Sequence, residues 1–353
     1  MSTFKTLFMG VGFAAIATLS ACSSSSNASL TQSGLNPADF DSTVLGKKTE
    51  LVTLKNANGM EVCLTNYGGR VVSISVPDKD GKPTDVVLGY DNIHQYADTL
   101  NSPSDYGSSV GRYANRIKDA KLSLAGSTYQ LKANDNGNCL HGGGATGWLN
   151  QVYDITEKND SSVTFTINAK DGENGFPGEF DVSVKYEFTE DNELRIHYQG
   201  ICDEPTVANM TNHSYFNLNG EGSGTAMDQY LTIHAKYYTP VADSHSIPTG
   251  VYGEVAGTPM DFRTAKKIGQ DIEAEFEQLK FTGGYDHNYV TDNYAKGNRR
   301  LIATAYSDKT GIAMDVTSDC PCVQFYAANF VENEHGKNGH TYNKRDAFCL
   351  ETQ

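Results

Sequence analysis

Apolar and polar residues alternate with a period of two along most of this chain, a pattern that predicts β-strands. The alternating runs follow one another with short polar or glycine-containing turns between them: residues 51–54 and 60–64, 71–76 and 85–88, 121–124 and 128–131, and then 162–167, 181–188 and 193–198. The first turn is Asn58-Gly59, and both residues tolerate the positive φ of a tight hairpin turn. We therefore expect antiparallel hairpins from about residue 49 onward.

Helical patterns are few. Residues 91–96 predict one capped helical turn. A second candidate is a stripe of apolar residues at helical spacing, Ile268, Ile272, Phe276 and Leu279. We expect it to form a short surface helix over a sheet, although Gly269 interrupts it. Strands at short intervals with so little helix predict an all-β fold, an antiparallel sandwich or barrel. No internal repeat or interior linker divides the chain, so we expect one domain.

The first residues have the pattern of a targeting segment. Lys5 precedes an apolar run from residue 7 to 19, which is short for a membrane span. Leu19-Ser20-Ala21-Cys22 resembles a bacterial lipoprotein box, so we expect a signal peptide over residues 1–21 and a lipid on Cys22. An ordinary secretory signal with an incidental cysteine is the alternative. Residues 22–42 then predict a flexible Ser-rich tether, and residues 43–353 the domain, held at the periplasmic side of the cell envelope, with outer-membrane sorting compatible with Ser23.

Composition excludes some classes of function. The formal net charge of −15 over 353 residues disfavours nucleic-acid binding, which needs a basic patch. The 20 tyrosines and 34 glycines are typical of sheets joined by tight turns, and also of carbohydrate sites. Six cysteines follow Cys22 without the spacing of a disulfide framework. Cys320-Pro321-Cys322 lacks the second cysteine pair of a zinc site, so buried thiols are expected.

The stretch with the most chemical character is residues 211–218, Thr-Asn-His-Ser-Tyr-Phe-Asn-Leu. His213 stands between Asn212 and Ser214, whose side chains can orient it by hydrogen bonds, and Tyr215 and Phe216 follow. Polar groups and aromatic faces beside one histidine suit a sugar-binding cleft. The alternative is a structural histidine at the end of a strand.

Four further segments are more polar than plain sheet requires: residues 111–117, 138–144, 283–288 and 349–353. The first carries Arg112 and Arg116, and the second places His141 against three glycines, where backbone can approach a ligand closely. The others contain Asp286 and Glu351. Each has a structural alternative, such as a turn, a surface ion pair or a solvated chain end. No histidine pair has the i, i+4 spacing of a helical metal site, so no metal is expected.

Taken together, these segments resemble the aldose 1-epimerase family, the galactose mutarotases. The resemblance runs from about residue 50 to the end of the chain, and the amino-terminal box marks a lipoprotein-type bacterial member. The motifs that carry it are residues 114–117 (Ala-Asn-Arg-Ile), 140–143 (Leu-His-Gly-Gly), 211–218, 286–288 (Asp-His-Asn), 323–326 (Val-Gln-Phe-Tyr) and 350–353 (Leu-Glu-Thr-Gln). They occur in the order and at the separations of the family.

The resemblance implies a large antiparallel β-sandwich, the galactose mutarotase-like supersandwich, with the sugar in an open cleft on one sheet. It implies His213 as general acid and Glu351 as general base, on opposite sides of a bound pyranose. The implied sugar contacts are Asn115, Arg116, His141, Asp286 and Gln324, with Tyr215 nearby. The implied reaction interconverts the anomers of free hexoses such as galactose and glucose, without metal, nucleotide or redox cofactor.

Two features depart from the family: the lipoprotein-like start, since many relatives are soluble in the cytoplasm, and the carboxy-terminal end. Family members continue for some tens of residues after the Leu-Glu-Thr-Gln motif, whereas this chain stops at Gln353, so we expect a truncated sequence. The alternative is a sugar-binding envelope lipoprotein that has lost catalysis because Glu351 is poorly held. An epimerase for phosphorylated sugars is a third hypothesis, but beyond Arg112 and Arg116 no basic residue can be placed near the cleft.

Overall fold

The computed structural model describes residues 29–100 and 105–353. The expected signal peptide, Cys22 and the start of the expected tether lie outside the described residues. Within the described ranges, no helix is long and apolar enough to cross a membrane.

Two four-stranded sheets form the amino-terminal half of the described chain, and all their neighbouring strands are antiparallel. One has the order β3 (Leu51–Lys55), β4 (Glu61–Thr65), β5 (Arg70–Pro77) and β6 (Pro83–Asp85). The other has the order β12 (Asp154–Lys158), β13 (Ser162–Ala169), β14 (Phe180–Phe188) and β15 (Leu194–Cys202).

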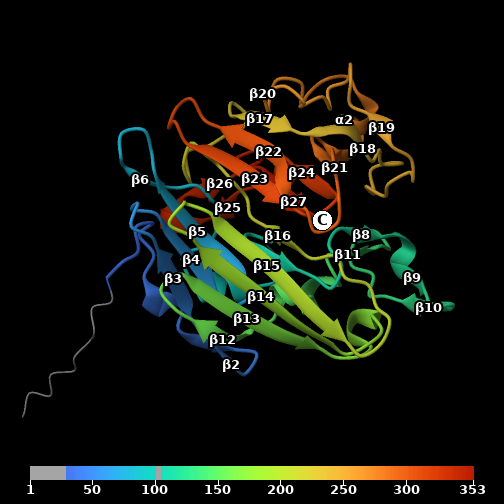
Figure 1. Ribbon diagram of the computed structural model, residues 1–353, viewed down its shortest axis with the longest axis horizontal. Coiled ribbons are helices and arrows are strands. Elements are labelled where there is room, and N and C mark those ends of the chain that lie inside the picture. The colour runs from blue at the N-terminus through green and yellow to red at the C-terminus, as the bar shows by residue number, and fades with distance from the viewer. Residues whose placement is uncertain (1–28, 101–104) are drawn as a thin grey trace, which may run out of the picture.

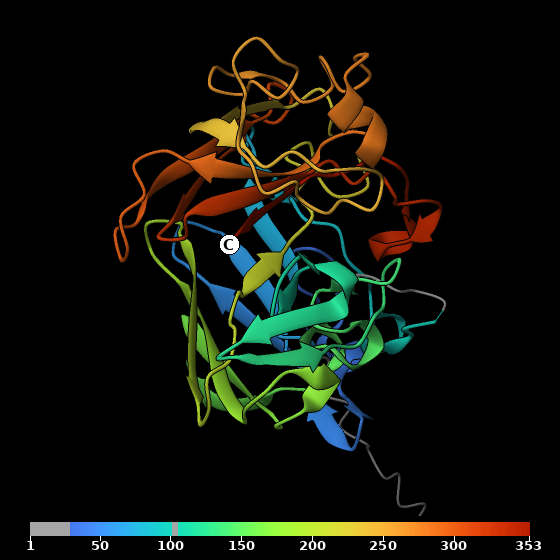
Figure 2. The same cartoon turned by 90° about the vertical axis from the view of Figure 1, so that its right-hand side faces the viewer.

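A four-stranded and a five-stranded sheet form the carboxy-terminal half, again with antiparallel neighbours. One has the order β20 (Lys266–Lys267), β17 (Tyr230–Ile233), β22 (Arg300–Tyr306) and β23 (Ala313–Ser318). The other has the order β19 (Gly253–Glu254), β18 (Ala235–Tyr238), β21 (Asp286–Thr291), β24 (Cys322–Tyr326) and β27 (Cys349–Thr352). Figures 1 and 2 show the two halves beside each other, with the carboxy-terminal end between them.

Each half is held by an apolar core between its two sheets. In the amino-terminal half, Leu54 and Leu64 belong to the same buried cluster as Phe165 and Val184 of the facing sheet. In the other half, Ile233 and Ile302 of one sheet share a cluster with Val323 and Phe325 of the second. Strand β14 alternates buried and less buried residues along its whole length, as a strand with one face on a core must. The predicted all-β antiparallel sandwich is confirmed.

Short elements connect the sheets. The two-stranded pairs are β1 (Ser42–Val44) with β2 (Lys47–Thr49), β7 (Ser108–Val110) with β16 (Thr211–His213), β8 (Arg116–Ile117) with β11 (Cys139–Leu140), β9 (Lys121–Leu124) with β10 (Ser127–Gln130), and β25 (Glu334–His335) with β26 (Thr341–Tyr342). The α-helices are α1 (Ile93–Ala97) and α2 (Glu277–Thr282). The 3₁₀ turns are η1 (Pro37–Phe40), η2 (Lys118–Ala120), η3 (Gly144–Thr146), η4 (Trp148–Asn150), η5 (Glu173–Gly175) and η6 (Lys337–Gly339). The predicted hairpins, and the capped turn at α1, are confirmed.

The helix expected from the apolar stripe at 268–279 is wrong for most of its length, because only α2 is helical. Ile268, Ile272 and Leu279 are buried in the core, so the apolar spacing marked core contacts rather than a helix face. The backbone N–H of Gly269 donates to the carbonyl of Met227, and a Cβ at Gly269 would lie 2.9 Å from the Met227 side chain. Residues 268–275 form turns and bends instead of a helix, with Gly269 fixed against the neighbouring segment.

The expected tether is also wrong over its second part, because residues 31–42 pack on the domain. Leu35 and Phe40 are 1% and 0% exposed and join one apolar core cluster. The backbone N–H of Gln32 donates to Glu61, and the hydroxyl of Thr49 donates to the Phe40 carbonyl. The folded domain therefore includes residues ahead of the expected boundary at 43.

The six cysteines in the described part carry free thiols. Cys63, Cys139 and Cys349 are buried as expected, whereas Cys202, Cys320 and Cys322 are only half-buried.

Candidate active site

All eight residues singled out for acid/base chemistry or sugar contact line one cavity with about 840 Å³ of empty space. They come from segments far apart in the sequence: Asn115, Arg116, His141, His213, Tyr215, Asp286, Gln324 and Glu351. Strands β8, β11, β16, β21, β24 and β27 or their ends supply them. A cavity lined by polar groups and aromatic rings is what a sugar site requires.

His213 ends the short strand β16, which pairs with β7. Its ring stacks on Tyr215 with centroids 5.0 Å apart and 19° between planes. The expectation that Asn212 and Ser214 orient this ring directly is wrong, because alternate residues of an extended chain point to opposite faces. Instead, Ser214 donates to Asn212, and Asn212 donates to the Gly107 carbonyl. These bonds fix the strand rather than the ring.

Glu351 lies on β27, directly opposite Gln324 of β24. The backbone groups of Cys322 and Gln353 exchange two hydrogen bonds, and the Gln353 side chain donates to Asn288. The carboxylate is 3% exposed. Glu351 is therefore well held in a paired strand, which removes the structural reason for expecting a loss of catalysis.

The acid and base candidates are in direct contact: Nε2 of His213 lies 3.4 Å from Oε1 of Glu351. The expectation that they stand on opposite sides of a pyranose is wrong in this respect. Adjacency suits anomer exchange, because the ring oxygen and the anomeric hydroxyl are both bonded to C1 and a single carbon holds them side by side.

Burial raises the pKa of Glu351 from 4.5 to about 7, and the nearby carboxylates of Asp286 and Asp105 also raise it, while His213 and Arg116 lower it. A carboxylate with a pKa close to neutrality can take up and release a proton at little cost. This is the property expected of a general base in a reversible reaction.

Asp286 and Gln324 form a fixed pair on neighbouring strands, with Nε2 of Gln324 donating to Oδ1 of Asp286 at 2.6 Å. Burial raises the pKa of Asp286, and Arg116 and the bond from Gln324 oppose the rise. The pair presents acceptor and amide groups to the cavity, where sugar hydroxyls can exchange hydrogen bonds with them.

The paired strands β8 and β11 present Asn115, Arg116 and His141 together. Asn115 adopts a positive φ of 61°, which asparagine tolerates, and its backbone N–H donates to Nδ1 of His141 at 3.2 Å. Nε of Arg116 donates to Asp135 at 2.7 Å, which aims the guanidinium. Burial lowers the pKa of His141 to about 4. His141 is therefore neutral at pH 7, with its hydrogen on Nε2.

A sequence profile of the aldose 1-epimerase family matches residues 50–353. The chain belongs to the aldose 1-epimerase family. It is 36% identical over 311 residues to an aldose 1-epimerase from Haemophilus influenzae, an alignment that covers 87% of each chain. It is 35% identical over 319 residues to a galactose mutarotase from Bos taurus, covering 90% of this chain and 89% of the other. The protein is accordingly an isomerase.

Solved structures agree with this assignment. An aldose epimerase homologue from C. elegans superposes with a TM-score of 0.76 at 30% identity, covering 86% of this chain and 89% of that one. A galactose 1-epimerase from Lactobacillus acidophilus gives a TM-score of 0.76 at 28% identity, covering 88% of both chains. The galactose mutarotase-like sandwich is thus the fold of this chain.

Arg112, which shares the Gly-Arg-Tyr-Ala-Asn-Arg segment with Arg116, lies away from the epimerase cavity. It is 2% exposed, and its Nη1 donates to the carbonyls of Pro177 and Gly178 and to the Thr206 hydroxyl. Its guanidinium is engaged by the protein itself, so its role is structural.

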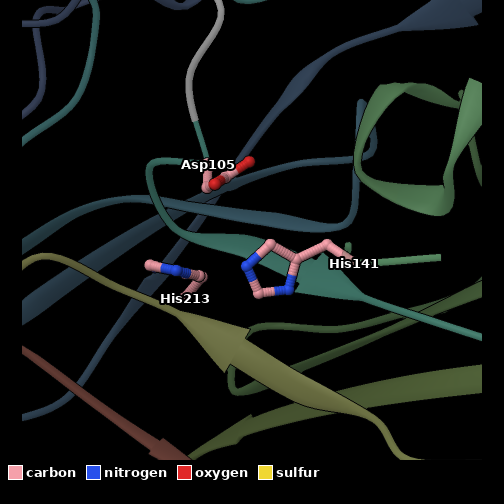
Figure 3. Close-up of side chains that lie close together, drawn as sticks. All are labelled: Asp105, His141 and His213. Carbon is pink, nitrogen blue, oxygen red and sulfur yellow. The ribbon is translucent and has the colours of Figure 1, made fainter. Parts of the chain in front are cut away.

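Sequence reasoning missed several residues that line the cavity, and one of them is Asp105. Donor atoms of Asp105, His141 and His213 all lie within 4.8 Å of one another, a spacing that would suit a metal site (Figure 3). His141 does not fit that role, because Nδ1 accepts from the Asn115 N–H and the neutral ring then carries hydrogen on Nε2. Neither nitrogen offers a free lone pair. A lone aspartate in a loop gave no signal in the sequence.

Proposed function

We propose that this chain interconverts the α and β anomers of free aldohexoses, galactose and glucose among them, by opening and closing the pyranose ring. The observation that carries the proposal is the contact between buried Glu351, with its pKa near 7, and His213 inside a cavity lined by hydrogen-bonding groups. The names of the relatives, aldose 1-epimerase and galactose mutarotase, support the choice of substrate.

Ring opening needs two proton transfers. The Glu351 carboxylate accepts the proton of the anomeric hydroxyl while the protonated His213 ring donates a proton to the ring oxygen. The bond between C1 and the ring oxygen breaks, and its electron pair stays on that oxygen. A C1 carbonyl forms from the electrons of the former O–H bond, so the product is the open-chain aldehyde.

Ring closure reverses these transfers. The C1–C2 bond turns by about half a revolution, so that the other face of the aldehyde meets the C5 hydroxyl. His213 takes the hydroxyl proton as the oxygen attacks C1, and Glu351 returns its proton to the former carbonyl oxygen. Both groups regain their starting states, as required for a reaction without net proton uptake.

The other cavity residues hold the sugar while C1 reacts. Arg116 and the Nε2–H of His141 are donors that can stabilise charge on sugar oxygens. Asp286, held by Gln324, accepts hydrogen bonds from hydroxyls, and Asn115 adds a further amide. The Tyr215 ring stacks on the His213 ring.

Polarimetry of fresh α-D-galactose and α-D-glucose tests the proposal. The purified chain should accelerate the approach to rotational equilibrium, and His213→Ala and Glu351→Ala should each lower the rate by about 10²- to 10⁴-fold. His197→Ala, on an exposed position of β15, is the control and should keep the rate. Wild-type rates in both cavity variants would refute this mechanism, and saturable binding without acceleration would indicate a sugar-binding protein instead.

We further propose that the enzyme is anchored in the cell envelope through a lipid on Cys22. The support is the sequence alone, with its lipoprotein-type box at residues 19–22 and the Ser-rich run after it. Mass analysis of protein extracted from membranes should find a diacylglyceryl-modified Cys22 at the amino terminus. An unmodified Cys22 in the membrane fraction would refute the anchor.

A further inference from the structure

The loop that carries Asp105 is attached directly to the backbone of His213. The N–H of Gly107 donates to the His213 carbonyl at 3.0 Å, and Val71 donates to the Gly107 carbonyl at 2.9 Å. A Cβ on residue 107, where φ is +67°, would lie 1.8 Å from the Val71 carbonyl, so only glycine permits this approach. Nη1 of Arg70 donates to the Tyr106 carbonyl at 2.9 Å. The position of Asp105 relative to the acid/base pair is therefore fixed by the fold.

Asp105 meets two imidazole rings at once. Its carboxylate, a ring nitrogen of His141 and one of His213 lie within 4.8 Å of one another, and the two rings are edge to face with centroids 5.3 Å apart (Figure 3). Burial by itself would raise the pKa of Asp105, but His141, His213 and Arg70 lower it below its ordinary value. The side chain is thus ionised at neutral pH. Nδ1 of His213 is buried and has no hydrogen-bond partner within the described part of the chain.

We propose that Asp105 is a positioning residue for the acid/base pair, whose negative charge stabilises the protonated His213 ring before it donates its proton. This inference rests on the proposed function and adds a residue to it. Before each ring opening His213 must carry a positive charge although its side chain is buried. A fixed carboxylate within about 4–6 Å compensates that charge. Neutral His141 does not contribute. The charge of Glu351 disappears in the same step as that of His213, so Asp105 adds a negative charge that persists through the step.

The same carboxylate acts on Glu351. The charged or titratable groups that face Glu351 are His213 on β16, Asp286 on β21, Arg116 on β8 and Asp105 on its loop. The two aspartates raise the pKa of Glu351, whereas His213 and Arg116 lower it. Removal of the charge at Asp105 therefore makes Glu351 a weaker base, in addition to weakening the support of His213. A purely structural role of Asp105 would produce neither effect.

The test is Asp105→Asn, which keeps the size of the side chain and removes its charge. We expect kcat for mutarotation to fall about tenfold or more, with KM changed less than about threefold. The acidic limb of the pH–rate profile should move to lower pH by ~0.5 unit or more. Asp105→Glu, which restores the charge, should recover part of kcat and return the limb toward its original position.

Asp243→Asn is the matched control, since Asp243 faces His245 at 3.8 Å on the exposed surface. Asp243→Asn should change neither kcat nor the acidic limb of the pH–rate profile. Should Asp105→Asn not fold, Asp105→Ser is measured in its place. A wild-type kcat in the folded variant would overturn the inference. So would a raised KM with unchanged kcat, which would make Asp105 a sugar contact, or a lower kcat with an unmoved limb. A wild-type chain without mutarotase activity would instead refute the proposed function.

Discussion

Nε2 of His213 lies 3.4 Å from Oε1 of Glu351, inside a cavity that both side chains line while remaining almost fully buried. The contact joins β16 to β27, two short strands whose pairing partners belong to different parts of the fold. The positive charge of a protonated His213 lowers the pKa of Glu351, against the larger effect of burial. The contact between His213 and Glu351 therefore depends on how the fold holds β16 and β27 next to each other.

The first prediction concerns pH. Because Glu351 acts as a base and its pKa is about 7, kcat/KM should rise with pH through about 7. The sign follows from the ionised form being the active one, so lowering the pH protonates it and removes activity. Polarimetric rates from pH 5 to 8.5 measure the limb. A profile that is flat down to pH 5 would contradict the assignment of Glu351 as base.

Glu351→Gln should lower the mutarotation rate and raise the stability of the folded protein at high pH. The pKa of Glu351 in the folded protein is raised from 4.5 to about 7, so the stability that its protonated form supplies is lost as pH rises through about 7. A glutamine has no such loss. The difference in free energy of unfolding between the variant and wild type should therefore be roughly 3 kcal/mol more favourable to the variant at pH 8 than at pH 4. Denaturant unfolding at both pH values measures the gain, and mutarotation should fall at least about 10²-fold. An equal difference at both pH values would refute the raised pKa.

Arg112 and Arg116 provide a matched pair from one segment. Arg116→Met removes a cation from the cavity, so kcat/KM should fall about 10²-fold and the acidic limb should move to higher pH, since Arg116 lowers the pKa of Glu351. Arg112→Met leaves two buried carbonyls without their donor and should cost about 2–5 kcal/mol of stability. The surviving folded protein should keep its KM. Kinetics and thermal unfolding of both variants check the contrast, which would fail if the two arginines behaved alike.

The hairpins could be predicted because their signals are local: period-two alternation around turns such as Asn58-Gly59 fixes both the strands and their antiparallel pairing. The stripe at 268–279 failed for the converse reason, because Gly269 packs against Met227, a neighbour that no local pattern shows. The amino-terminal boundary failed similarly. Polar residues around Leu35 and Phe40 suggested a tether, whereas two apolar side chains suffice to attach the segment to the core.

In the active site, too, some features could be predicted from the sequence and others could not. His213 and Glu351 could be named from the resemblance of their motifs to a family, but their contact depends on the register of β27 against β24. Asp105 could not be named, because its importance comes from Gly107 binding the His213 backbone, which is a tertiary contact. Arg112 and Arg116 looked equivalent in sequence, and only the structure distinguishes their roles. Arg112 donates to the Pro177 carbonyl, whereas Arg116 lines the cavity.

The last prediction tests where the folded domain begins, using two leucines. Leu35 is 1% exposed within a core cluster, and Leu45 is 67% exposed. Leu35→Ala should cost about 2–5 kcal/mol, because it removes buried methyl groups and leaves a cavity among the residues around Phe40. Leu45→Ala should change the stability by less than about 0.5 kcal/mol. Urea unfolding of both variants distinguishes the cases. Equal, negligible effects would mean that the residues around Leu35 are a tether after all and that the domain starts closer to residue 43.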